Sequence, residues 1–162
     1  MISLGANTDI GSHAIKPFEY NSINNSIPSR SILLDFKQKL QQKLQIALND
    51  ANDENINTLD DSFIKAKYFI EILCFSQQID LPSIGVEESG NLLFEWYKKN
   101  SDINATIFSI IFSRENYIFS LFKNGNNDTC GVLNYSNISR EIILRLIQEN
   151  FGVQSDARSR AH

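Results

Sequence analysis

The residue types that most often perform acid–base or nucleophilic chemistry are few in this chain and far apart. The chain has 162 residues and two histidines, His13 and His162, one near each end. Histidine is the commonest general base, and it activates a serine or cysteine only when it packs beside that residue. We expect both histidines to lie in mobile terminal segments, so the sequence predicts no catalytic system built on histidine.

Carboxylates offer a second route to catalysis, because two of them placed across a cleft can divide the acid and base roles. Asp60-Asp61 opens a predicted helix, where capping and the positive end of the helix dipole explain the pair. Glu87-Glu88 falls at a predicted hairpin turn and is expected to be solvated. Glu95 is different, because it lies in the middle of a predicted strand among apolar residues.

The two-residue period of a strand places Glu95 on the same face as Leu93 and Tyr97. A carboxylate there must face water or find a partner, because an unpaired buried charge is costly. Three roles stay open for Glu95: an exposed cross-strand charge partner, a polar contact inside a binding face, or a catalytic acid.

The cysteines and glycines show no spacing that is typical of a metal or phosphate site. Cys74 falls in a predicted helix and Cys130 at a turn, with no Cys-x-x-Cys. The glycines form neither a GxGxxG motif nor a P-loop. We therefore predict two free thiols, no cofactor and no metal. The chain shows no signal-peptide pattern and no apolar stretch of membrane-spanning length, so we expect a cytoplasmic protein without a membrane partner.

The charge of the chain argues against a nucleic-acid partner. The formal net charge is −4, and the densest basic group is Lys98-Lys99. Tyr117-Ile118-Phe119 and Ile107-Phe108 suggest the aromatic strands on which RNA-binding sheets stack bases. The lysines and arginines that such a surface needs are absent between them, so a core role is the simpler interpretation.

The helical segments fall at both ends of one domain. We expect an irregular or flexible arm over 1–28, a single domain over 29–152 and a flexible tail over 153–162. A first helix is predicted after Pro28, and its apolar stripe consists of Leu33, Phe36, Leu40, Leu44 and Leu48. The polar stretch 49–55 is expected to end it in a loop.

A second helix is predicted from a Thr58 cap to about Gln77 or Gln78, and a last one from Ser136 or Ser139 to about Gly152. Between the second and last helices the pattern changes to that of strands. Strands are expected at Ser83–Glu87, Asn91–Lys98, Asn104–Phe112, Tyr117–Lys123 and Cys130–Asn134. The stretch 124–128 is interpreted as the loop before the last strand.

This order predicts an α+β fold with two N-terminal helices, an antiparallel five-stranded meander and a C-terminal helix. Antiparallel sheets usually bury one face and wet the other. The segment 81–122 carries apolar residues on both faces, and the chain has few helices to cover both. That surplus predicts a binding surface.

A short pattern resembles one found in small uncharacterised bacterial proteins. It consists of Leu81-Pro82-Ser83-Ile84 and Gly90-Asn91-Leu92-Leu93-Phe94-Glu95-Trp96-Tyr97, with Tyr117-Ile118-Phe119 and Gly131 in the later places. The resemblance covers residues 63–151. It implies an accessory or mobile gene and no settled enzymatic activity.

The leading hypothesis is a non-enzymatic protein-binding module, with an antitoxin, immunity or inhibitor role as its specific version. The tentative binding residues are Glu95, Tyr97, Tyr117 and Phe119, and the partner is another protein, a second copy of the chain, or both. One alternative is a carboxylate-dependent enzyme or toxin that uses residues such as Glu95 and Asp60. Another is a small nucleic-acid-associated regulator.

Overall fold

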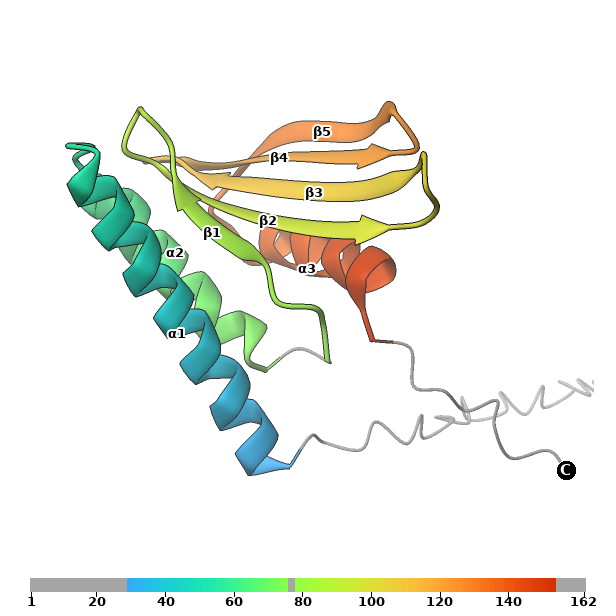
Figure 1. Cartoon of the computed structure of the whole chain (residues 1–162), viewed down its shortest axis with the longest axis horizontal. Coiled ribbons are helices and arrows are strands. Elements are labelled where there is room, and N and C mark those ends of the chain that lie inside the picture. Colours follow the sequence, from blue (N-terminus) through green and yellow to red (C-terminus); the bar gives the residue numbers. More distant parts are fainter. Residues whose placement is uncertain (1–28, 76–77, 154–162) are drawn as a thin grey trace, which may run out of the picture.

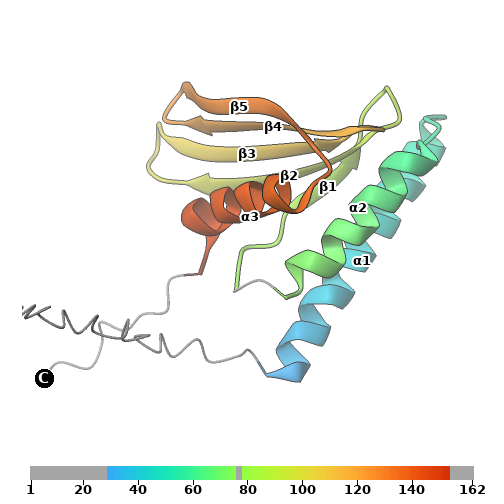
Figure 2. The same cartoon turned by 180° about the vertical axis from the view of Figure 1, so that it is seen from behind.

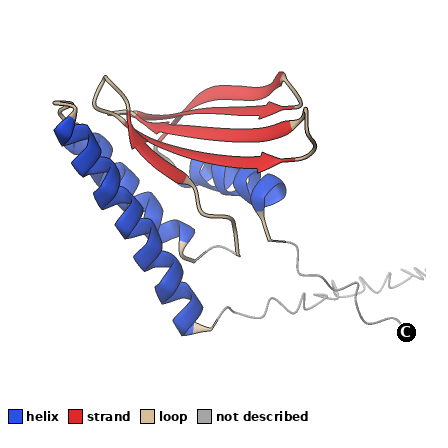
Figure 3. Cartoon of the chain, viewed as in Figure 1, coloured by secondary structure: helices blue, strands red, loops and turns tan. Residues whose placement is uncertain are grey.

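The computed structural model describes residues 29–75 and 78–153 as three helices and one sheet. In chain order the elements are α1 (Arg30–Asp53), α2 (Asp60–Leu73), β1 (Ser83–Val86), β2 (Leu92–Lys99), β3 (Ala105–Phe112), β4 (Asn116–Lys123), β5 (Asn126–Asn134) and α3 (Asn137–Phe151). The strands follow one another across the sheet, and each is antiparallel to its neighbour. The predicted α+β fold with a five-stranded meander is confirmed (Figures 1 and 3).

The predicted terminal arm at 1–28 lies outside the described residues, and so does the predicted tail beyond Val153. His13 and His162 fall in these two segments.

One face of the sheet carries the hydrophobic core. Alternate side chains of β2, β3 and β4 are buried on it: Leu92, Phe94, Trp96, Phe108, Ile110, Phe112, Tyr117, Phe119 and Leu121. Apolar residues of all three helices join the same cluster. In Figures 1 and 2, α3 runs along this face while α1 and α2 pack together at the β1 side. No described helix lies on the opposite face.

Phe69 anchors α2 to the covered face. Its ring lies 6.3 Å from that of Phe94, 5.3 Å from that of Phe112 and 5.9 Å from that of Tyr117, between centroids. These separations are in the range where tilted and edge-on aromatic pairs attract. Trp96 is buried on the same face as Leu92 and Phe94, and its ring centroid lies 6.4 Å from that of Phe94. The indole nitrogen of Trp96 donates a hydrogen bond to the Asp80 carbonyl at 2.8 Å.

The predicted end of the first helix was wrong, because α1 continues through the polar stretch to Asp53. Ala47 and Ala51 are buried and extend the apolar stripe by another turn. Glu54 is the C-cap, and Asn55, the next residue, has φ +59° and turns the chain away from the helix. The Ile56 N–H donates to the Ala51 carbonyl and the Asn55 N–H to the Asn52 carbonyl. This pair of bonds is the Schellman motif, in which asparagine can take the place of glycine.

The predicted cap of the second helix was also wrong. Leu59 occupies the N-cap position, and no side chain caps the helix. The Leu59 N–H instead donates to the carbonyl of Gly90 at 2.9 Å, which ties the helix start to the β1–β2 turn. Asp60 and Asp61 lie in the first turn as expected. The helix ends at Leu73, before the expected end, and residues 76–77 are outside the described ranges.

The last helix agrees with the sequence. Ser136 is its N-cap and accepts a hydrogen bond from the Ser139 N–H at 3.1 Å, and the helix ends at Phe151.

The last strand begins four residues earlier than predicted, at Asn126. Asn124 has φ +52° and Gly125 has φ +82°, so these two residues alone make the turn. Positive φ at both central residues is the property of the tight hairpin turn that Asn-Gly favours. The interpretation of 124–128 as a loop was therefore wrong, and β5 is a nine-residue strand.

Truncation of Trp96 tests the assignment of the core. Trp96→Ala is expected to lower the free energy of unfolding by about 3 to 5 kcal/mol, because a fully buried indole leaves a large cavity. Denaturant unfolding measures this change. The matched control is Tyr97→Ala on the opposite face, which should change stability by less than about 1 kcal/mol. Equal losses in the two variants would contradict the assignment.

A second test concerns the buried hydrogen bond between α2 and β2. The Ser62 hydroxyl accepts a hydrogen bond from the Leu92 N–H at 2.7 Å, and both residues are buried. Ser62→Ala leaves that N–H without a partner and is expected to cost about 1 to 3 kcal/mol. Ser89→Ala, in the exposed β1–β2 turn, is the control. Thermal unfolding that does not distinguish the two variants would show that the hydrogen bond is unimportant.

Candidate functional site

The candidate site is the sheet face that no described helix covers, called here the uncovered face. The strand register arranges its side chains in three rows that cross β2 to β5. The first apolar row is Leu93, Ile111, Ile118 and Val132; the polar row is Glu95, Ser109, Ser120 and Cys130; the second apolar row is Tyr97, Ile107 and Phe122. A polar strip therefore runs between two apolar strips.

The apolar rows are open to solvent at their outer members. Tyr97 is 60% exposed and Val132 is 61% exposed, and Ile118 and Phe122 are also exposed. Leu93, Ile107 and Ile111 are half-buried. Contiguous exposed apolar patches are uncommon on monomeric proteins and mark interaction sites.

Glu95 lies in the polar row, with serines as its cross-strand neighbours. Its register partners are Ser83 on β1 and Ser109 on β3. The Ser109 hydroxyl donates a hydrogen bond to the Glu95 carboxylate at 3.1 Å. Of the three roles left open for Glu95, that of a cross-strand charge partner does not fit its register, because its partners across the strands are hydroxyls. A carboxylate held this way can still accept hydrogen bonds from a bound molecule.

The structure does not bring Glu95 and Asp60 together. Asp60 begins α2, which packs on the covered face, whereas Glu95 projects from the uncovered face. The sheet therefore separates the two carboxylates. Within residues 29–75 and 78–153, no group of three histidine, cysteine, aspartate or glutamate side chains is placed to hold a metal ion.

Two of the four tentative binding residues lie in the core. Tyr117 is 4% exposed and Phe119 is 7% exposed, and both belong to the covered face. Their register partners Phe112 and Ile110 are buried there as well. The expectation that Tyr117 and Phe119 contact a partner on the open face is corrected. The apolar β4 residues that do point outward are Ile118 and Phe122.

Tyr135 joins α2 to the sheet from the end of β5. Its hydroxyl donates to the Ser113 carbonyl at 2.5 Å, and the ammonium of Lys65 lies 4.7 Å from its ring centroid. Burial raises the pKa of Tyr135 well above the usual range, so it stays neutral at physiological pH. Tyr135 therefore has a structural role.

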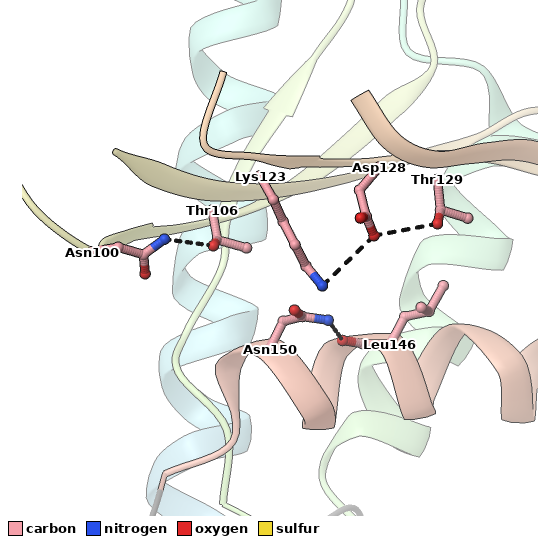
Figure 4. A network of polar contacts seen from close by, with 7 residues as sticks. All are labelled: Asn100, Thr106, Lys123, Asp128, Thr129, Leu146 and Asn150. Atoms are coloured by element: carbon pink, nitrogen blue, oxygen red, sulfur yellow. Dashed lines mark hydrogen bonds and ion pairs between the residues drawn. The ribbon is translucent and has the colours of Figure 1, made fainter. Parts of the chain in front are cut away.

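A polar cluster lies between the far end of the sheet and α3 (Figure 4). Lys123 forms an ion pair with Asp128 at 3.6 Å, and Thr129 donates to the same carboxylate oxygen at 3.4 Å. The side-chain amide of Asn150 donates to the Leu146 carbonyl at 2.7 Å. Lys123, Asp128 and Thr129 therefore bond to one another on β4 and β5, whereas the Asn150 bond is internal to α3.

A cleft of about 200 Å³ lies between α1 and α2. It is lined by Gln41, Leu44, Gln45, Leu48, Phe63, Lys67, Ile70 and Glu71. Its volume is below that of a usual ligand pocket. No helix in the described ranges is long and apolar enough to cross a membrane.

Comparison with protein-family models, with curated proteins and with solved structures found no match. The resemblance to small bacterial accessory-gene proteins therefore stays a prediction.

Replacement of Glu95 by glutamine tests whether its charge supports the fold. Glu95→Gln is expected to change the free energy of unfolding by less than about 0.5 kcal/mol, because an amide oxygen can still accept the Ser109 hydrogen bond. Chemical denaturation provides the measurement. A loss above about 2 kcal/mol would show that the carboxylate is a structural element and not a group kept for a partner.

Proposed function

We propose that this protein is a non-enzymatic binding module that holds another protein against the uncovered face of its sheet. The observation that carries the proposal is the row pattern of that face. Two apolar strips, one of which carries the exposed aromatic side chains of Tyr97 and Phe122, flank a polar strip whose carboxylate is oriented by a serine hydroxyl. The face therefore offers both a large apolar area and a directional hydrogen-bond acceptor.

The composition of the face suits a protein partner. Aromatic residues dominate the energetics of protein interfaces, and Tyr97 and Phe122 are exposed at the same end of the sheet. Charged groups are depleted at interface centres, and Glu95 is the one charged member of the three rows. Such a face fits the apolar side of a helix or sheet that donates a hydrogen bond at its centre.

The specific version of the proposal is an antitoxin, immunity or inhibitor role in the cytoplasm. The small size, the formal net charge of −4 and the resemblance to accessory-gene proteins support it. Cys74 and Cys130 are free thiols, which suits a reducing compartment. A second copy of the chain is the other protein partner that the sequence predicts.

Two other classes of function have less support. A carboxylate-dependent enzyme or toxin needs two carboxylates across a cleft, and the sheet separates Glu95 from Asp60. A nucleic-acid-associated regulator needs basic side chains around its aromatic residues. The nearest lysine on this side, Lys99, is engaged with Asp102 at 3.0 Å.

Affinity capture from the native host with matched variants tests the proposal. The face variant carries Tyr97→Ala and Phe122→Ala. The control variant carries Phe75→Ala and Ile138→Ala, which remove side chains that are 86% and 72% exposed outside the uncovered face. The wild-type and control proteins are expected to retain one partner. The face variant is expected to lose it, because its affinity for that partner should be at least about tenfold weaker.

Circular dichroism of all three proteins checks that each is folded. Retention of the partner by the face variant, or its loss from the control variant alone, would contradict the proposed surface. If Glu95→Gln abolished the biological effect while fold and partner affinity stayed normal, the enzyme hypothesis would replace this proposal.

A further inference from the structure

The outer edge of β5 is a second candidate interaction surface, separate from the uncovered face. The two edge strands of the sheet differ, because α1 packs against β1, whereas among the described elements β4 is the principal neighbour of β5. In Figures 1 and 2, β5 forms the free upper border of the sheet. An edge strand presents backbone N–H and C=O groups that pair readily with another extended chain.

The β5 edge lacks most of the features that protect a free edge from pairing. Its sequence, NNDTCGVLN, contains no proline, lysine or arginine. Its single charge, Asp128, is paired with Lys123. The register irregularity lies near the start of the strand, opposite Leu121 and Phe122. The stretch from Thr129 to Leu133 is therefore regular, and the Asn134 carbonyl at its end accepts a hydrogen bond from the Ser136 N–H at 2.9 Å.

We propose that two copies of this chain pair antiparallel along β5, with the two-fold axis at Val132, and form one continuous ten-stranded sheet. This inference goes beyond the proposed function and does not depend on it, because it concerns the edge of the sheet and not its uncovered face. A second copy suits this edge because, in this register, the side chains on both faces of β5 fit those of an identical strand.

On the uncovered face, the register places Val132 directly opposite Val132 of the second copy. Val132 ends the first apolar row, beside Ile118, and is exposed in the single chain. Pairing at this point joins the two apolar rows end to end and removes two exposed valines from water. Apolar β-branched residues opposite each other stabilise a strand pair.

On the covered face, the same register places Gly131 opposite Leu133 of the second copy, twice by symmetry. The Phe119 ring fills the space beside Gly131, since a Cβ atom there would lie only 3.1 Å from the Phe119 Cε1 atom. Leu133 is half-buried and packs at the rim of the core. Because Gly131 has no side chain, Leu133 of the second copy would lie against the Phe119 ring that covers this glycine.

Disulfide trapping tests both the edge and the register. Opposite residues in an antiparallel pair have Cα atoms about 4.5 to 5.5 Å apart, within the range that a disulfide spans. With the native thiol removed by Cys130→Ser, Val132→Cys is expected to form a crosslinked dimer under mild oxidation. Thr129→Cys in the same background should remain uncrosslinked, because this register does not place residue 129 opposite itself.

Light scattering supplies the second measurement. The wild-type protein is expected to have twice the mass of one chain, and Val132→Lys to have the mass of one chain, because it places two like charges opposite each other. Ile138→Lys, an exposed position on α3, is the control and should stay dimeric. The Tyr97→Ala and Phe122→Ala variant should also stay dimeric, which separates failure here from failure of the proposed function.

A wild-type protein with the mass of one chain would overturn the proposal. Crosslinking of Thr129→Cys in preference to Val132→Cys would overturn the register. A dimer that survives Val132→Lys but is lost in the Tyr97→Ala and Phe122→Ala variant would place the contact on the uncovered face instead.

Discussion

The alternation of side chains along a β-strand is the constraint on which the rest of this structure depends. Successive side chains point to opposite faces, so burial of Leu92, Phe94 and Trp96 forces Leu93, Glu95 and Tyr97 to the other side. The same rule in β3 and β4 completes a core face of nine buried apolar side chains. All three helices contribute to the one cluster under that face. No described helix is left to cover the second face, and the strands nevertheless place apolar residues on it.

The two faces of the sheet therefore have different explanations. The covered face is explained by stability, because its aromatic rings contact one another and Phe69 of α2. The uncovered face has no such explanation, since an antiparallel sheet with one solvated face normally carries polar residues there. The proposed protein partner would account for its apolar rows and for the polar row between them. A dimer through the β5 edge would place two such faces side by side in one sheet.

The sequence predicted those features that depend on residues close together in the chain. The alternation around Glu95, the Ser136 cap and the order of the elements follow from local patterns. The assignment of Tyr117 and Phe119 to the binding face failed because it depends on the register across the β3–β4 turn. A shift of one residue there exchanges the faces of the whole strand. The Asn124-Gly125 pair is a typical signal of a two-residue turn, but the polar residues that follow it favoured the interpretation as a longer loop. The start of α2 at Leu59 was less predictable, because it depends on a hydrogen bond to the distant Gly90. The end of α1 was less predictable, because it depends on a left-handed conformation at Asn55.

Hydroxyl-radical footprinting of the complex isolated from the native host tests the central claim most directly. The oxidation of Tyr97 and Phe122 is compared between the protein alone and the protein with its partner bound, and Phe75 at the end of α2 serves as the reference. If the uncovered face holds the partner, Tyr97 and Phe122 become protected in the complex while Phe75 is oxidised to the same extent in both. Unchanged oxidation of Tyr97 and Phe122, together with protection of Phe75, would contradict the account.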